Sequence, residues 1–393
     1  MANHLKQAAV SILTLAALVS AITLANVQSS ADRVRAATRE GARAGAAFAM
    51  TNEVDDNRII TYRRATDGTL TRVGSVSTRG NGIGVDLDAQ GGLTLSSDHE
   101  FLYAANAGSD EVSVFGVDGT DLTFLQKVYA GDQPLSITLH EDLLYVLDGS
   151  VAGNGILGFE VAADGTLSEI PKSFRLLSSP IAVPGQVQFS PNGRKLLVTH
   201  KTTNVLLPPK NAIDVFRIGS DGLASATPRR EASHGLRPFS LAFRDDGKLV
   251  VVESFNAAPE RSAVSSYRLG DRGALNVISG SVRNNQTDVC WVVITDNGRY
   301  VYTANFGSGT ISSYRFGDRG KLHLMRGKAA FTGALSQPVD LALSRDSSFL
   351  YLLLRGTGAV AAFDVAGDGS LMPLGVVKGG LPVADGVSGL AAY

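Results

Sequence analysis

The sequence predicts an all-β fold, and three observations support this. Short runs of alternating apolar residues recur along the chain, Gly-containing turns follow them, and no helical pattern occurs after residue 45. Alternation with a period of two is typical of half-buried strands, and Asp-Gly after such a run is typical of a hairpin. The chain is also 44% hydrophobic and only 19% charged, so it is too apolar to be disordered.

One unit recurs seven times, at a spacing of about 50 residues. Each copy is an alternating run that ends in an aromatic residue and is followed by a turn. The copies are 60–62, 112–115, 156–159, 213–216, 264–267, 311–314 and 360–363. Two further apolar runs precede six of them, so each period contains about four strands. Four strands in roughly 40 to 50 residues predict one blade of a β-propeller.

The two ends of the repeat array predict how the ring closes. The first copy lacks its leading strand, because Ala46–Met50 has the pattern of a second strand. The last residues, Val387–Tyr393, have the pattern of a leading strand with nothing after it. We therefore predict a seven-bladed β-propeller with four-stranded blades, in which the C-terminal strand pairs into the first blade and leaves no open sheet edge.

The N-terminal segment differs from the rest of the chain. Lys6 precedes an uncharged apolar stretch, Ala8–Ala25, and the small residues Ser29, Ser30 and Ala31 follow. This order is typical of a secretory signal, although an uncleaved membrane anchor is the alternative. We predict a signal peptide at 1–31, an Ala/Arg/Gly-rich linker at 32–45 and the propeller at 46–393. The protein is then secreted or periplasmic, with no other membrane association.

Charge and cysteine content exclude several classes of protein. The formal net charge is −1, whereas a nucleic-acid-binding surface needs clustered positive charge. The single Cys allows neither an intramolecular disulfide nor a cysteine-based zinc site. We expect a monomer that binds a small polar ligand and contains no cofactor.

Several stretches resemble the lactonase-type seven-bladed propellers, the family of bacterial 6-phosphogluconolactonase and fungal carboxymuconate cyclase. The resemblance covers about residues 46–393 and is carried by stretches such as Gln186–Gly193, Cys290–Val293 and Gly307–Tyr314. It is closest to an exported branch of the family. The resemblance implies the propeller fold and a lactone-opening activity.

Three departures from the catalytic members weaken that implied activity. Those members look like Pro-His-x-His where this chain has 182–185, and like Pro-Arg-His where it has 238–240. Their Asn-Glu pair is matched here by Ser254 and Phe255, although Glu253 is adjacent. The resemblance therefore implies the fold more than it implies the 6-phosphogluconolactonase reaction.

Polar residues end most of the predicted second strands, where they are expected to line one mouth of the channel. These are Asn52, Asn106, Asp148, His200, Glu253 and Asn305, and Lys201 and Arg355 follow two of the seven strand ends. Lactone opening needs a base to activate water and a cation or donor for the oxyanion. His200 or Glu253 fits the base, and Lys201 or Arg355 the cation. The structural alternative is that Asn and Asp stand there because they favour turns.

The predicted inner strands contribute a second set of candidates near their starts: Gln186, Trp291 and Asp340. Trp291 is the only Trp of the chain, and it either stacks on a sugar ring or packs between blades. Asp340 either binds a hydroxyl group or hydrogen-bonds to backbone amides.

These candidates predict an exported lactonase-like propeller that hydrolyses a sugar lactone or related cyclic ester, with His200, Glu253 and Lys201 as catalytic residues. Asn106, Asp148, Gln186, Trp291, Asn305, Asp340 and Arg355 are then the ligand-binding residues. The first alternative is a non-catalytic propeller that binds a glycan, a cell-wall component or a protein. The second is a metal-assisted lactonase in which Asp and Asn oxygens hold Ca²⁺.

Overall fold

The computed structural model describes residues 44–151, 153–201 and 211–393. Gly45–Tyr393 forms one compact unit. The predicted signal peptide lies outside the described residues, and so does the predicted linker except for its last two residues. Gly45 already belongs to the first strand, one residue before the predicted start of the propeller.

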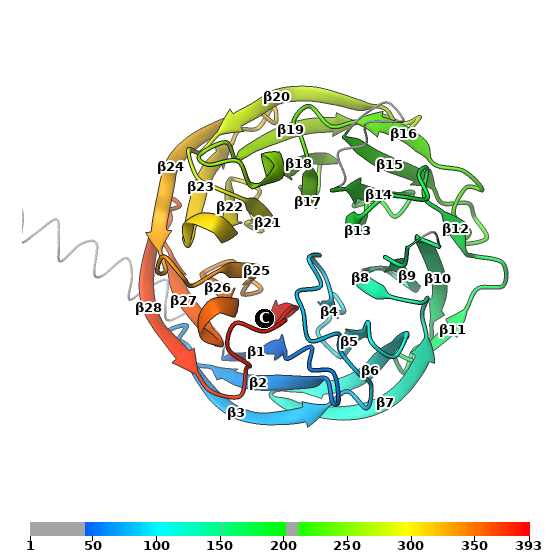
Figure 1. Ribbon diagram of the computed structural model, residues 1–393, viewed down its shortest axis with the longest axis horizontal. Coiled ribbons are helices and arrows are strands. Elements are labelled where there is room, and N and C mark those ends of the chain that lie inside the picture. Colours follow the sequence, from blue (N-terminus) through cyan, green and yellow to red (C-terminus); the bar gives the residue numbers. More distant parts are fainter. Residues whose placement is uncertain (1–43, 152, 202–210) are drawn as a thin grey trace, which may run out of the picture. The chain divides into compact units, whose positions relative to one another are not determined.

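Seven antiparallel sheets are arranged around a central axis, as Figure 1 shows. The first blade is β29 (Leu390–Ala392), β1 (Gly45–Met50), β2 (Arg58–Arg64) and β3 (Leu70–Ser77). The second is β4 (Leu93–Leu95), β5 (Phe101–Asn106), β6 (Glu111–Asp118) and β7 (Asp121–Tyr129). The third is β8 (Pro134–His140), β9 (Leu143–Asp148), β10 (Gly155–Val161) and β11 (Leu167–Glu169), with β12 (Arg175–Leu176) also paired to β10. The fourth is β13 (Pro184–Phe189), β14 (Lys195–His200), β15 (Ala212–Arg217) and β16 (Arg229–Ala232).

The last three blades follow the same order. The fifth is β17 (Pro238–Phe243), β18 (Lys248–Glu253), β19 (Ala263–Leu269) and β20 (Leu275–Arg283). The sixth is β21 (Val289–Ile294), β22 (Tyr300–Asn305), β23 (Thr310–Phe316) and β24 (Leu322–Phe331). The seventh is β25 (Pro338–Leu343), β26 (Phe349–Leu354), β27 (Ala359–Val365) and β28 (Leu371–Lys378). Short 3₁₀ turns follow their second strands: η1 (Phe255–Ala257), η2 (Phe306–Ser308) and η3 (Arg355–Thr357).

The ring closes as the sequence predicts. β29 pairs antiparallel with β1, with Phe48 opposite Ala391. The C-terminal strand is thus the innermost strand of the first blade, and the seven-bladed fold with four strands per blade is confirmed. Among the described residues no helix is long and apolar enough to cross a membrane.

Aromatic side chains from the repeated segments fill the space between neighbouring blades. The aromatic residue that ends each repeated run is buried: Tyr62, Phe115, Phe159, Phe216, Tyr267, Tyr314 and Phe363. Four of them, Phe115, Phe159, Phe216 and Tyr267, lie in clusters with apolar residues of their own and the preceding blade. Phe115, for example, lies with Leu102 of its own blade and Phe48 of the blade before it. Burying such rings provides much of the free energy that holds one blade against the next.

A repeated tyrosine contact also joins adjacent blades through the Asp-Gly turns. Tyr103 on β5 donates to the carbonyl of Gly165 in the next blade, at 3.2 Å. Tyr145, Tyr302 and Tyr351 make the equivalent bonds to Gly222, Gly369 and Gly68. Gly68 adopts φ +84°, a conformation that disfavours other residues. Since the Tyr351 bond joins the last blade to the first, the same contact also helps to close the ring.

Candidate functional site

The asparagines predicted at the mouth lie inside the blades. Asn106 is fully buried; it accepts hydrogen bonds from Asn57 and Thr78, and its amide donates to Ser113 on the third strand of its blade at 2.8 Å. Asn57 belongs to the preceding blade, so this amide fastens two blades together. Asn305 repeats the arrangement, accepting from Asn284 and donating to Ser312.

Glu253 occupies the same position in the fifth blade and is also fully buried. Its carboxylate accepts hydrogen bonds from the Gly235 amide at 2.8 Å, the Ser265 hydroxyl at 2.5 Å and the Ser281 hydroxyl at 2.6 Å. Buried carboxylates with this many donors are usually held in one place by their neighbours. Ser265 stands where Ser113 and Ser312 stand in their blades, so Glu253 replaces the asparagine in the same fastening.

His200 and Asp148 complete this set of strand ends. His200 is buried, and its Nε2 lies 3.0 Å from the carboxylate of Asp214 on β15. Asp148 accepts the backbone amides of Asp132 and Ser150, as a turn-capping side chain does. The predicted catalytic roles of His200 and Glu253 remain predictions; the contacts of both side chains are those of a packed interior.

The chain between β3 and β4 enters the middle of the ring (Figure 1). Residues 86–91, here called the central segment, contact several blades. The Gln90 side chain forms two hydrogen bonds with the backbone of Val292 on β21, at 2.9 and 3.0 Å. The backbone N–H of Gln90 donates to the carbonyl of Gly185 on β13, and the backbone carbonyl of Gln90 accepts from the Ser136 hydroxyl on β8. The central segment is therefore tied to three blades besides its own.

Trp291 helps to hold the central segment. Its indole donates to the Ala89 carbonyl at 3.2 Å, and its ring packs against Phe239 with the centroids 5.1 Å apart. Only 2% of Trp291 is exposed, as expected for a ring packed between blades. Its packing role is thus seen in the structure, and its role in ligand binding stays a prediction.

Asp88 of the central segment meets two cations. Lys201 Nζ donates to the Asp88 carboxylate at 2.7 Å and also to the Asp88 carbonyl. An Arg237 guanidinium nitrogen lies 3.7 Å from the same carboxylate. Burial lowers the pKa of Lys201, and the Asp88 charge acts in the opposite direction. Lys201 is almost fully buried, whereas 43% of the Asp88 side chain is exposed, so solvent reaches this group through Asp88.

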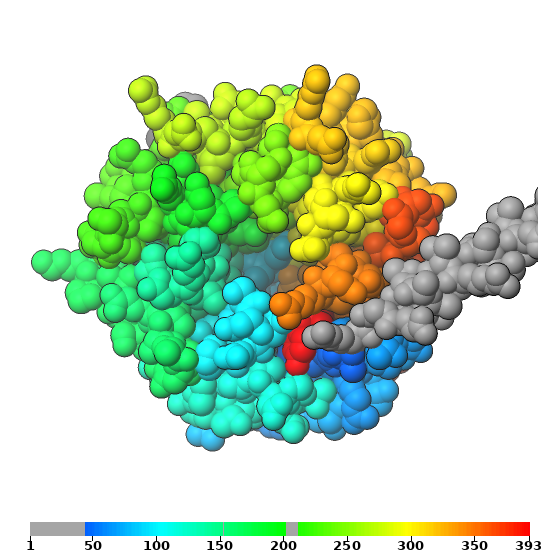
Figure 2. Space-filling model, turned by 180° about the vertical axis from the view of Figure 1, so that it is seen from behind, coloured from blue at the N-terminus to red at the C-terminus, as the bar shows by residue number. Residues whose placement is uncertain are grey.

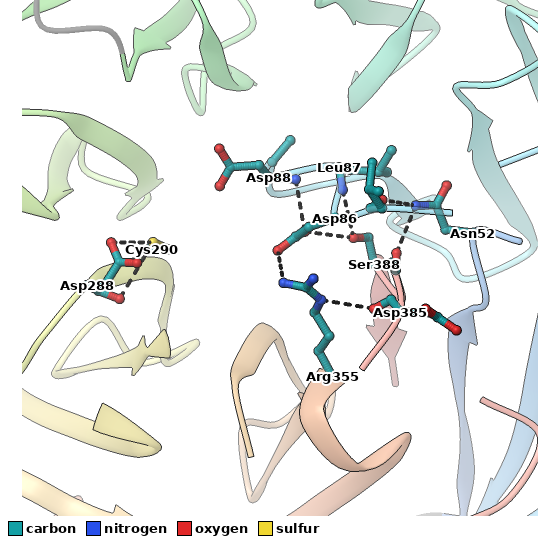
Figure 3. Close-up of polar contacts among 12 residues, drawn as sticks. Asn52, Asp86, Leu87, Asp88, Asp288, Cys290, Arg355, Asp385 and Ser388 are labelled. Carbon is teal, nitrogen blue, oxygen red and sulfur yellow. Dashed lines mark hydrogen bonds and ion pairs between the residues drawn. The ribbon is translucent and has the colours of Figure 1, made fainter. Parts of the chain in front are cut away.

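Asp86 meets a third cation two residues earlier, as Figure 3 shows. Arg355 lies 3.4 Å from the Asp86 carboxylate and donates to the Asp385 carbonyl. Asp86 also accepts from Ser388, just before the closing strand, and from the backbone amide of Asp88. Burial raises the pKa of Asp86, and Arg355 opposes that shift. The predicted residues Lys201 and Arg355 are thus connected by one short segment of chain.

Asp288 directly precedes β21, and the charges of Lys201 and Arg237 act on it. Burial raises the pKa of its carboxyl, and the charges of Arg237 and Lys201 oppose the rise, while that of Asp88 adds to it. The Cys290 thiol lies 3.6 Å from Asp288, as drawn in Figure 3, and burial raises the pKa of that thiol well above its usual value. Cys290 is therefore a protonated, unreactive thiol. Asp288 is therefore a partly buried acid whose raised pKa comes from burial and whose charge is felt by cations of two other blades.

Asp340 and Gln186 lie on the innermost strands of their blades, β25 and β13. Asp340 accepts the Gly389 amide at 2.6 Å, and burial raises the pKa of its carboxyl to about 8. Asp340 therefore makes the backbone contact that was one of its two expected roles. Gln186 accepts the Leu241 amide at 2.7 Å and also lines a cavity of about 520 Å³ with Gln90 and Thr138. Figure 2, from the opposite side, shows the centre of the ring hollowed.

The connection between β1 and β2 lines a second cavity, of about 430 Å³, whose wall includes the acids Glu53, Asp55 and Asp56 and the cation Arg58. Within the ranges 44–151, 153–201 and 211–393, no group of three or more His, Cys, Asp or Glu side chains is arranged to hold a metal ion.

Sequence reasoning missed Asp86, Asp88, Arg237 and Asp288. All four stand in or next to connections between blades, at 86–88, 237 and 288. Arg237 precedes the Pro that starts an inner strand, a position that Gln occupies at 133 and 337, and no repeated pattern marks the other three. The available signal was a pair of aspartates in a long connection between β3 and β4, which a fold built from tight turns does not require.

The fold and this mouth define a class of protein: a seven-bladed propeller with a charged site at the centre of the ring. The sequence model of the family described as "Lactonase, 7-bladed beta-propeller" matches residues 43–184 and 253–339. The chain belongs to this lactonase family. Among curated proteins, none matches the chain.

Solved structures of similar fold include proteins of related name. A putative 6-phosphogluconolactonase of Bacteroides uniformis has 16% sequence identity and a TM-score of 0.68, covering 88% of this chain and 99% of that one. The periplasmic gluconolactonase of Pseudomonas aeruginosa has 17% identity and a TM-score of 0.63, with the same two coverages. A protein of Lactobacillus plantarum has 17% identity and a TM-score of 0.67. At these identities the likeness shows the fold.

Proposed function

We propose that this protein hydrolyses a sugar lactone or a related cyclic ester at the charged mouth formed by Lys201, Arg237, Asp288 and the central segment. The observation that carries the proposal is that Lys201 and Arg237, from two blades, meet at Asp88 of the central segment. The charges of both cations also act on the partly buried carboxyl of Asp288, which starts a third blade. Membership of the lactonase family supports the reaction class.

The chemistry requires few groups. Asp288 as a carboxylate accepts a proton from water, and the water oxygen attacks the ring carbonyl carbon. The Arg237 guanidinium stabilises the oxyanion that forms. The ring carbon–oxygen bond then breaks, the released alkoxide takes the proton from Asp288, and the product is an open hydroxy acid.

We assign the base to Asp288 in preference to His200 or Glu253 because of solvent access. Both of those side chains are buried with 2% exposure or less, and their polar atoms face other protein groups. Asp288 is only partly buried. Arg237 also reaches solvent, with 25% of its side chain exposed.

The proposal includes export to the periplasm or the exterior, action as a monomer and a small polar ligand. The apolar stretch Ala8–Ala25 after Lys6 supports export. The name of the Pseudomonas aeruginosa neighbour, a periplasmic gluconolactonase, agrees with it.

The test is acid release from glucono-1,5-lactone in a pH-stat, above the spontaneous rate. We expect hydrolysis by the wild type and a fall in kcat of about 100-fold in Asp288→Asn, the size of a lost general base. Asp271→Asn, which changes an exposed turn carboxylate, is the matched control and keeps full activity. No acid release from a panel of neutral and phosphorylated sugar lactones would sink the proposal.

A non-catalytic binding protein is the second candidate. The observation that favours it is that Asp88 already pairs with Lys201, so part of the mouth is filled by the protein's own chain. In that case calorimetry detects binding of an uncharged ligand, such as a polyol or the amide of a sugar acid, while no lactone is hydrolysed.

A further inference from the structure

Asp88 holds the position that an anionic group of a ligand would take. Lys201 Nζ directs two of its three protons at Asp88, one at the carboxylate and one at the carbonyl. The ammonium also lies 4.9 Å from the centre of the Phe239 ring, and only 3% of the Lys201 side chain is exposed. A buried ammonium with these partners has little capacity left for a phosphate or carboxylate of a substrate.

The charges at this mouth cancel. The cations are Lys201, Arg237 and Arg355, and Asp86 and Asp88 lie within ion-pair distance of them. The Asp288 carboxyl is the third acid, and the charges of Lys201 and Arg237 act on its pKa. Three positive groups therefore face three acids, and the described part of the mouth has no excess of positive charge. Sites that bind phosphate groups rely on such an excess, together with bidentate contacts.

The backbone fixes Asp88 in this position. Its φ is 50°, and its amide donates to the Asp86 carboxylate at 2.9 Å. The following two residues are bonded to Trp291 and Val292. An aspartate held at both sides by these contacts is part of the wall of the site.

We propose that Asp88 is a specificity-determining residue that restricts this site to uncharged lactones and rejects substrates bearing a phosphate or carboxylate. The inference rests on the proposed function and names its substrate class. A phosphate group that approached Lys201 or Arg237 would have to displace Asp88 or lie beside it, and like charges at contact distance disfavour binding. The same repulsion speeds release of the product, because ring opening creates a carboxylate.

The experiment compares glucono-1,5-lactone with its 6-phosphate in the wild type and in Asp88→Asn. Asn keeps an acceptor for Lys201 and tolerates a positive φ, so the fold is retained. We expect the wild type to prefer the neutral lactone by at least about 10-fold in kcat/KM, and the variant to shift this ratio at least about 10-fold toward the phosphorylated one. Asp271→Asn is the charge-matched control and leaves the ratio unchanged.

Two results would overturn the inference. One is a wild type that hydrolyses the phosphorylated lactone as well as the neutral one. The other is a substrate ratio that Asp88→Asn leaves unchanged. Asp88→Gly, which suits the same φ, repeats the test if the Asn variant does not fold.

A binding measurement separates this inference from the proposed function. Calorimetry with 6-phosphogluconate requires no hydrolysis, and we expect binding to be at least about 10-fold tighter in Asp88→Asn than in the wild type. If no lactone is hydrolysed but this gain occurs, the proposed reaction fails and Asp88 still excludes anions. If hydrolysis occurs and the gain does not, the role of Asp88 fails alone.

Discussion

The ends of the second strands and the central segment use polar residues in opposite ways. At the strand ends, Asn106, Glu253 and Asn305 are fully buried and bonded to serines of the neighbouring strand. In the central segment, Asp86 and Asp88 reach across to cations of other blades and remain partly open to solvent. Polar residues that recur around a propeller therefore can serve to join its blades, while the proposed chemistry depends on a connection that breaks the repeat.

The largest effect is expected at Glu253, where a substitution tests whether the strand-end residues are structural or catalytic. Glu253→Ala removes the acceptor of the Gly235 amide and of two serine hydroxyls. We expect the free energy of unfolding to fall by about 3–5 kcal/mol, because several buried donors lose their partner. Denaturant unfolding measures this, with Glu100→Ala at an exposed turn as control. Unchanged stability together with lost hydrolysis would instead place Glu253 in the reaction.

Arg237, which lies near Asp88, tests whether the residues around the central segment take part in the reaction. Arg237→Gln removes the charge assigned to the oxyanion, and we expect kcat/KM to fall about 100-fold. The free energy of unfolding should change by less than about 1 kcal/mol, since the side chain is partly exposed. Arg272→Gln, in an exposed turn, is the control for both measurements. A large loss of stability with full activity would make Arg237 a structural residue.

Asp340, on the innermost strand β25, should make the stability of the fold depend on pH. Burial raises its pKa from 3.8 to about 8, so the folded protein keeps a proton that the unfolded chain loses. Stability should therefore fall as pH rises from 4 through 8, whereas Asp340→Asn lacks this component. We expect the Tm of the variant minus that of the wild type to grow by about 2 °C or more between pH 6 and 9. Scanning calorimetry at matched ionic strength measures it, and parallel curves would contradict it.

Gln90 and Gln126 provide the smallest and most closely matched test. Gln126 bridges to the backbone of Leu167 with two hydrogen bonds, as Gln90 bridges to Val292. Each Ala substitution should cost about 1 kcal/mol of stability. Only Gln90→Ala should also change KM for a lactone, because only Gln90 fixes the central segment. Equal KM values in the two variants would show that the central segment does not contribute to lactone binding.

The fold followed from the sequence because it is repetitive. Seven copies of one pattern, with Asp-Gly turns, predict both the number of blades and the closing strand at Val387–Tyr393, and the structure confirms both. The tyrosine contacts to those turns could not be foreseen, since they join residues about 60 positions apart or more across two blades.

The site followed only in part. Lys201 and Arg355 do pair with the two aspartates of the central segment, and their roles in the reaction and in ligand binding stay predictions. The strand-end position alone could not distinguish them from Asn106 or Glu253, because the direction of a side chain depends on the local twist and on the next blade. Asp86 and Asp88 stand in a segment without periodicity, and its path across the ring is set by contacts with distant blades.

The central segment also has a mechanical consequence. A closed ring of seven sheets deforms most easily by becoming oval, a motion in which opposite blades separate while their neighbours approach. The central segment is hydrogen-bonded to Ser136, Gly185 and Val292 in three different blades, so it resists that motion. Asp86 and Asp88 belong to this segment. Any force that makes the ring oval therefore acts directly on the ion pairs Asp86–Arg355 and Asp88–Lys201.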